Sequence, residues 1–153
     1  MLRNVCIKPV TTASTETTVR EASQLMRSKN IGALVVVGSG GKPKGLLTDR
    51  DIVVDVVAQG KDPATIQVAE VMRKNPAVIT EDKGILDATR ILGERGVRRL
   101  PIVSKKGKLV GIIALDDVLM LLGSEMGHVA SALSRGLGRA GFEGERRPRS
   151  KRA

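Results

Sequence analysis

Aromatic residues are almost absent from this sequence of 153 residues, which contains no Trp, no Tyr and one Phe. The interior must therefore be packed from aliphatic side chains, and a hydrophobic content of 41% is enough to supply them. The shortage also removes aromatic stacking, with which proteins commonly hold the bases of single-stranded nucleic acid. The composition predicts one compact domain, or two small halves that share a core.

Cysteine and histidine occur once each, as Cys6 and His128. A single Cys cannot form a disulfide within the chain, which is typical of proteins from reducing compartments. Cys6 has no evident Cys or His partner that would activate it as a nucleophile. No His/Cys cluster has metal-ligand spacing, and no G-x-x-x-x-G-K-[ST] phosphate loop is present. The sequence therefore predicts a protein that is not an enzyme and has neither a catalytic cofactor nor a metal.

Long apolar runs are also lacking. No segment reaches the ~18 apolar residues of a membrane span, and the opening MLRNVCIKPV has no apolar core of a secretion signal. We therefore expect a soluble, cytoplasmic protein with no membrane association.

The positive charge is unevenly distributed. The net charge is +10, and Arg135–Ala153 holds seven basic residues against Glu143 and Glu145, which is half of the excess. This Gly-rich stretch has no apolar periodicity after Leu137, so residues 124–153 are predicted to form a helix fragment followed by a disordered basic tail. The tail is either a solvated terminus or a contact surface for nucleic acid, whose binding would then depend steeply on salt.

An internal repeat organises the chain. Thr18–Val57 aligns without gaps with Gly84–Gly123, an offset of 66 residues. The identical pairs are Ala22/Ala88, Leu34/Leu100, Val37/Val103, Gly41/Gly107, Lys42/Lys108, Gly45/Gly111 and Asp51/Asp117.

Both units predict the same order of elements. In the first, a helix begins near Thr18, which has capping-box spacing to Glu21, and ends near Asn30; strands at 33–37 and 45–48 follow, and a second helix starts near Asp49. The second unit predicts a helix at 85–95, strands at 100–103 and 109–114, and a helix from Leu115. A helical turn is expected at 68–73, ahead of Asn75-Pro76.

The helices that follow the second strand of each unit are apolar on most sides, around 52–57 and 118–122. Such helices must be buried on more than one face. Either a deep intramolecular core or a second copy of the chain covers them, and self-association is the natural answer for so short a chain.

Thr48 and Asp51 lie one turn apart where a strand enters a helix. Backbone N–H groups there favour an anion such as phosphate, and a carboxylate can accept both hydroxyls of a ribose. Two arginines, Arg98 and Arg99, precede a buried strand of the second unit, and a twofold-like packing of the units would bring them toward Thr48. Taken alone, Thr48 and Asp51 could simply be helix caps, and the arginines a solvated surface pair.

These residues carry a family resemblance. The duplicated unit, the G-h-h-T-x-x-D stretch at Gly45–Asp51 (h, apolar), the Arg-Leu-Pro-Ile-Val strand and the Val71-Met72 lead-in resemble paired cystathionine-β-synthase (CBS) domains, the Bateman module. The resemblance implies an α/β fold in which two pseudosymmetric βαββα repeats, 4–60 and 68–123, pack sheet to sheet as one module. It further implies a homodimer and a regulatory module that binds AMP, ADP or ATP between the repeats, with S-adenosylmethionine as a further candidate ligand.

The resemblance also implies residue roles. Asp51 corresponds to the ribose ligand, Thr48 to its phosphate or ribose neighbour, and Arg98 and Arg99 to the phosphate-binding pair. Arg50 either reaches the phosphates or points to solvent. Residues Cys6, Thr11 and Ile31 fall where the family lines the adenine pocket.

A second cleft, with Val97 and Asp117, is expected to be weaker. Ala114 stands there in place of the Thr, and Gly32 and Ala33 in place of the arginines. A phosphate would lack its hydroxyl donor and its cations, so one good site per chain is expected.

The resulting function is an adenine-nucleotide sensor that passes ligand state to an unidentified regulated protein; the alternative is a nucleic-acid-associated protein that binds through Arg135–Ala153.

Overall fold

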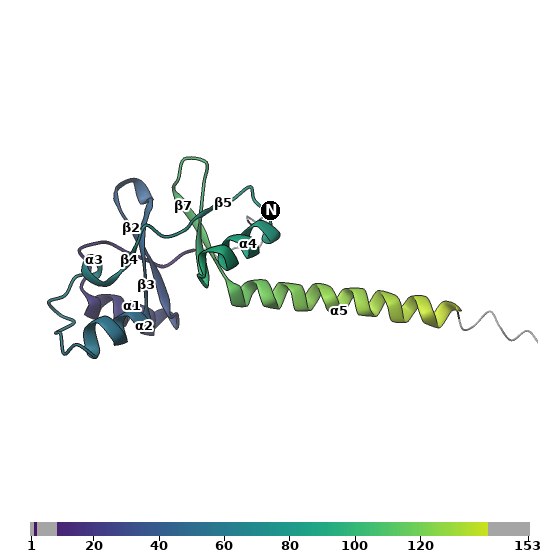
Figure 1. Ribbon diagram of the computed structural model, residues 1–153, viewed down its shortest axis with the longest axis horizontal. Helices are drawn as coiled ribbons and strands as arrows, with labels where there is room; N and C mark the ends of the chain where they lie inside the picture. Colours follow the sequence, from purple (N-terminus) through teal and green to yellow (C-terminus); the bar gives the residue numbers. More distant parts are fainter. Residues whose placement is uncertain (1, 3–8, 141–153) are drawn as a thin grey trace, which may run out of the picture. The chain divides into compact units, whose positions relative to one another are not determined.

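A computed structural model describes Leu2 and residues 9–140, without the side chains of 137–140 (Figure 1). The chain divides into two compact units, Met1–Leu115 and Asp116–Ala153. In chain order the elements are β1 (Thr12–Ala13), α1 (Val19–Lys29), β2 (Ala33–Val37), the 3₁₀ turn η2 (Ser39–Gly41), β3 (Pro43–Thr48), α2 (Asp49–Ile52), the π-helix η3 (Val53–Val57), α3 (Val68–Val71), β4 (Arg73–Lys74), β5 (Ile79–Thr80), α4 (Ile85–Arg95), β6 (Arg99–Val103), β7 (Leu109–Ala114) and α5 (Leu115–Ala140).

Two sheets in the first unit carry the repeat. One has the order β1-β2-β3-β4 and the other β5-β6-β7. In each, a two-residue strand pairs in parallel with the next strand, which then pairs antiparallel with its successor. The mixed α/β architecture and the duplication predicted from the sequence are confirmed.

The two repeats share their irregularities as well as their strands. The register shifts between Val36 and Val37 in β2 and between Ile102 and Val103 in β6. The Asp49 N–H donates to the Gly32 carbonyl at 3.1 Å, and the Leu115 N–H donates to the Arg98 carbonyl at 2.9 Å. These matched features place Gly32 and Arg98 at equivalent strand entries.

The core of the first repeat is aliphatic, as the composition requires. Val19, Ala22 and Met26 of α1 pack with Leu34, Val36 and Leu47 of the sheet, and Val56, Val68 and Val71 complete the cluster. Burial of this apolar surface is the main force that holds α1 against β2 and β3.

A reciprocal cap starts α1. The Glu21 N–H donates to Thr18 Oγ1 at 3.2 Å, while the Thr18 N–H and hydroxyl each donate to Glu21 Oε2 at 2.8 Å. The Thr18 backbone N–H, and then its hydroxyl, hold the pKa of Glu21 below its usual value. The capping box predicted from the Thr18 and Glu21 spacing is confirmed.

Substitution of this cap is expected to destabilise the protein in a pH-dependent way. Thr18→Ala should lower the free energy of unfolding by about 1 kcal/mol near neutral pH, because a helix N–H loses its acceptor. Because the folded pKa of Glu21 is depressed, its contribution is present above the unfolded pKa and is lost as the pH falls through the folded value. Urea unfolding of wild type, Thr18→Ala and Glu21→Gln at several pH values checks this. A Glu21→Gln deficit that does not shrink in acid contradicts it.

Two local expectations are corrected by the structure. The helical turn expected at 68–73 ends at Val71, Met72 is extended, and Arg73 and Lys74 form the edge strand β4 on β3. The helix that starts at Leu115 continues to Ala140, so Arg135–Ala140 of the predicted disordered tail is helical. Arg, Leu and Ala favour helix, and the four such residues in Arg135–Ala140 outnumber its two glycines. The rest of the tail, residues 141–153, lies outside the described residues.

Candidate functional site

Asp51 is the one charged side chain that is buried among the described residues, with 5% of its surface exposed. It lies at the third position of α2, directly after β3. A buried carboxylate is costly unless its oxygens accept hydrogen bonds. Its partners therefore define the site.

Thr48 occupies one carboxylate oxygen. The Thr48 hydroxyl donates to Asp51 Oδ2 at 2.7 Å, and the Thr48 N–H donates to the same oxygen at 3.0 Å. In return the Asp51 N–H donates to Thr48 Oγ1 at 3.2 Å. This is the cap expected from the sequence, and it fixes the orientation of the carboxylate.

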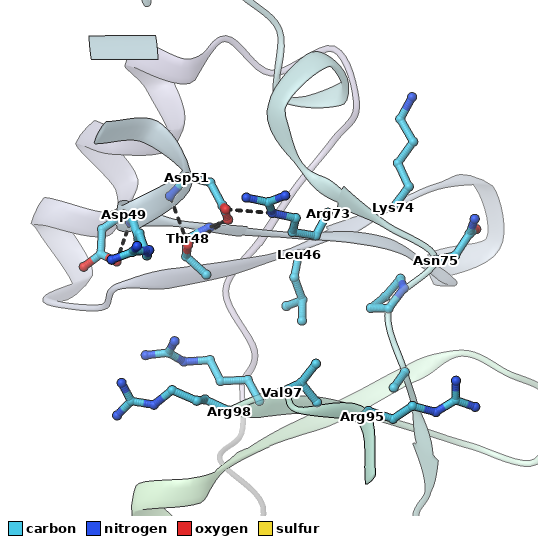
Figure 2. Close-up of a pocket in the computed structure, with 14 residues that line it drawn as sticks. Leu46, Thr48, Asp49, Asp51, Arg73, Lys74, Asn75, Arg95, Val97 and Arg98 are labelled. Atoms are coloured by element: carbon cyan, nitrogen blue, oxygen red, sulfur yellow. Dashed lines mark hydrogen bonds and ion pairs between the residues drawn. The ribbon is translucent and has the colours of Figure 1, made fainter. Parts of the chain in front are cut away.

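Arg73 approaches the other oxygen from β4. Its Nε donates to Asp51 Oδ1 at 2.9 Å (Figure 2). A terminal nitrogen of Arg73 also lies 3.7 Å from Asp55 Oδ2. The strand pairing Leu46↔Arg73 brings Arg73 there. Gly45 permits this pairing, because a Cβ at Gly45 would lie 2.4 Å from Met72 Sδ and 3.1 Å from the Arg73 carbonyl oxygen.

A cavity of about 790 Å³ opens beside these residues. Its volume lies in the usual range for small-molecule sites. Six basic and two acidic side chains are among its lining residues, which gives it a strong positive bias. The lining residues are Leu46, Thr48, Asp49, Arg50, Asp51, Arg73, Lys74, Asn75, Pro76, Ala77, Arg95, Val97, Arg98 and Arg99.

The cavity has walls from both repeats. Thr48, Asp51 and Arg73 lie on one wall, and Arg95, Val97 and Arg98 on the facing wall, where α4 leads into β6 (Figure 2). The left-handed cap Gly96, with φ 60°, turns the chain between α4 and this segment. The arrangement sets a fixed carboxylate opposite guanidinium groups, which suits a ligand with both hydroxyls and negative charge.

The equivalent strand entry in the first repeat cannot provide the same cations. Gly32 stands where the second repeat has Arg98, and a Cβ at Gly32 would lie 2.8 Å from Asp49 Oδ2. A side chain would fit there only if Asp49 moved. The two repeats are therefore chemically unequal although their backbones match.

The structure brings five of the predicted site residues together: Thr48, Arg50, Asp51, Arg98 and Arg99 all line the cavity. Val97, assigned from the sequence to a second cleft, lines this cavity too.

The remaining predicted site residues lie elsewhere or are not described. Thr11 and Ile31 are not among the lining residues, and Ile31 packs against the core of the first repeat. Asp117 lies in the first turn of α5, and Cys6 lies outside the described residues.

The sequence pattern did not indicate the part of the wall contributed by Arg73–Ala77. One signal was available, because the residue before a proline avoids right-handed helical geometry, so Asn75-Pro76 indicated that the helical turn ends before Asn75. In the structure Asn75 has φ 52° and its N–H donates to the Lys44 carbonyl at 3.1 Å, which anchors the end of β4 to β3.

Among the described residues, no group of three or more His, Cys, Asp or Glu side chains could hold a metal ion. Within the same residues, every helix is too short or too polar to cross a membrane.

Comparison with known proteins identifies the repeats. The family model of the CBS domain matches twice, at residues 2–57 and 68–124. An uncharacterised protein of Methanopyrus kandleri is 38% identical over 112 residues, which are 73% of this chain and 57% of that protein. The CBS domain-containing protein YhcV of Bacillus subtilis is 42% identical over 109 residues, which are 71% of this chain and 76% of YhcV.

A solved structure has the same architecture. The CBS domain pair of protein MJ0100, in complex with 5-methylthioadenosine and S-adenosyl-L-methionine, superposes with a TM-score of 0.73 at 26% identity. The match covers 82% of this chain and 97% of that chain. The shared architecture is that of two paired CBS repeats.

Proposed function

The chain belongs to the CBS-domain family as a tandem pair, and we propose that it is a regulatory module that binds an adenine nucleotide in the Asp51 cavity. The observation that carries the proposal is the pairing of one buried, pre-oriented carboxylate with a cavity wall rich in arginine. An adenosine-type ligand is supported by the MJ0100 pair, which was solved with two such molecules.

Each half of the nucleotide has a partner of matching chemistry. Asp51 lines the cavity and accepts the ribose hydroxyls, while Thr48 keeps its carboxylate in place. Arg98 and Arg99 pair with phosphate from the facing wall, since guanidinium groups bind phosphate oxygens in a bidentate manner. Arg50, in the first turn of α2, also lines the cavity and adds to its positive charge.

The same charge distribution favours phosphorylated ligands over S-adenosylmethionine. The four positive charges by which basic lining residues exceed acidic ones attract an anion and repel a sulfonium. AMP, ADP and ATP are therefore the ligands we propose. No lining residue is a Ser, Cys or His, which fits binding without chemistry.

Calorimetric titration with AMP, ADP, ATP, adenosine and S-adenosylmethionine tests the proposal. We expect saturable binding of at least one of the three nucleotides, and weaker binding of S-adenosylmethionine. Tighter binding of S-adenosylmethionine than of any nucleotide contradicts the assignment of a phosphorylated ligand. Absence of binding by all five contradicts the sensor itself.

We further propose that the module is a homodimer. Val53, Val54 and Val57 of η3 expose 56%, 44% and 63% of their surfaces, and Leu119 and Met120 of α5 expose 61% and 78%. Large apolar side chains exposed in this way on a helix, as on each of these two, are typical of an interface. A second copy of the chain is the partner that the sequence argument favours.

Sedimentation at micromolar concentration is therefore expected to report twice the chain mass of 16.3 kDa. Val57→Asp and Met120→Asp together should give monomers, because a charge at each helix surface would be desolvated in the dimer. Leu86→Asp on α4, where Leu86 is 77% exposed, is the matched control and should leave the dimer intact. A wild-type monomer contradicts the assembly.

A further inference from the structure

The carboxylate assigned to the ribose hydroxyls has a partner that the proposed function does not use. Arg73 Nε donates to Asp51 Oδ1 at 2.9 Å, on the oxygen that Thr48 leaves open. An ionised carboxylate has about four lone-pair sites, two on each oxygen; Thr48 uses both on Oδ2, and Arg73 uses one on Oδ1. A ribose that places both of its hydroxyls on Asp51 therefore competes with Arg73 for Oδ1. The outcome depends on where the guanidinium group goes.

We propose that Arg73 makes the cavity select phosphorylated adenosine ligands over adenosine, by exchanging its bond to Asp51 for a bond to the ligand's phosphates. The inference rests on the proposed function and names the residue that ties ribose recognition to phosphate recognition. Adenosine must displace Arg73 and offers it no anion in return. A nucleotide displaces it and supplies one.

The side chains of Asp51 and Arg73 differ greatly in conformational freedom, which makes the exchange feasible. The side chain of Asp51 is 7% exposed and is held by Thr48, whereas that of Arg73 is 69% exposed. A solvent-exposed guanidinium group on a long side chain changes rotamer on the nanosecond scale. The carboxylate therefore stays in place while Arg73 moves.

Asp55 keeps Arg73 near the cavity. Its Oδ2 lies 3.7 Å from a terminal nitrogen of Arg73, and its side chain is 31% exposed. Asp55 lies in the π-helix η3, where the Ala58 N–H donates to the Val53 carbonyl five residues earlier at 2.8 Å. Asp51 and Asp55 are about one turn apart, so one guanidinium group spans both carboxylates.

Lys74 is a suitable contrast to Arg73, because it also lines the cavity and belongs to the same two-residue strand. In Figure 2 the guanidinium group of Arg73 points toward Asp51, whereas the Lys74 side chain points away from it. Both contribute one positive charge to the cavity. Only Arg73 competes for the Asp51 carboxylate.

Titration of wild type, Arg73→Gln, Arg73→Ala and Lys74→Ala with ATP and with adenosine tests the inference. Both Arg73 variants should bind ATP about tenfold more weakly, because a charge-assisted contact is lost. Their affinity for adenosine should be unchanged or higher, because Oδ1 is then open. Lys74→Ala removes one positive charge without opening Asp51, so its loss of ATP affinity should be smaller than that of the Arg73 variants, and its affinity for adenosine should be unchanged.

Thermal unfolding of each variant shows whether the fold is intact, and Arg73→Gln removes the positive charge while it keeps a polar side chain at this position of β4. An equal loss of ATP and adenosine affinity in Arg73→Gln, or no change in either, overturns the role of Arg73 and leaves the nucleotide site standing. Wild-type protein that binds none of AMP, ADP, ATP and adenosine overturns the site and the inference together.

Discussion

Asp51→Ala is expected to weaken ATP binding by about tenfold to a hundredfold, because a charge-assisted hydrogen bond contributes about 1.5–3 kcal/mol. The loss should extend to adenosine, since the ribose hydroxyls are common to both ligands. Asp49 also lines the cavity, but it is exposed, whereas Asp51 is the one buried charged side chain among the described residues. Calorimetric titration measures both affinities.

Stability must be measured beside affinity in this variant. The Asp51 carboxylate also accepts two hydrogen bonds from Thr48 and one from Arg73, so its removal leaves these three hydrogen bonds unmade. Asp51→Asn retains an acceptor oxygen for the Thr48 donors and is the milder variant. Asp117→Ala, at the equivalent position of the second repeat, is the matched control and should change ATP affinity little. If Asp117→Ala loses ATP binding while Asp51→Ala keeps the wild-type affinity, the ligand has been assigned here to the wrong repeat.

Replacement of Arg98 and Arg99 together by Ala should weaken ATP binding by about tenfold or more, with a much smaller effect on adenosine. Arg98 and Arg99 line the facing wall, and the contacts that we propose for them are to phosphate. Their partial exposure and solvent screening limit the effect of each one. The affinity loss should also shrink at high salt, because screening weakens the same interaction in wild type.

Arg95→Ala is the control for the double variant. Arg95 lines the same cavity from the end of α4, but it precedes the turn at Gly96 that leads to the phosphate-facing pair. Its removal changes the cavity charge by one unit without touching Arg98 or Arg99. If Arg95→Ala weakens ATP binding as much as the double variant does, net charge rather than a specific phosphate contact determines affinity.

The duplicated part of the fold was readable from the sequence. The strand at 33–37 was predicted with its observed bounds, because a β-branched run ends there at a glycine turn. The strand at 109–114 and the helices that begin after Thr18 and at Leu115 were also predicted correctly. These elements depend on local pattern, which repeats at the same offset in both halves.

Elements that depend on distant contacts were not readable. Strand β4 has two residues, and its pairing is possible only because Gly45 leaves room for Met72 and the backbone of Arg73. The Arg73 side chain in this strand contacts Asp51, which lies 22 positions earlier in the sequence. The hydrophobic periodicity of the sequence cannot predict a contact of this kind. The cavity that joins β4 to the start of β6 was therefore only partly predicted, from Thr48, Asp51 and the arginine pair.

The central claim is that an adenine nucleotide binds between Thr48–Asp51 and Val97–Arg99, and a titration of ¹⁵N-labelled protein with the tightest-binding of AMP, ADP and ATP tests it most directly. We expect saturable shifts of the backbone amide resonances in these two segments and at Arg73. Shifts that leave both segments unchanged and gather instead at the smaller cavity lined by Val37, Gly41 and Lys108 would contradict the account.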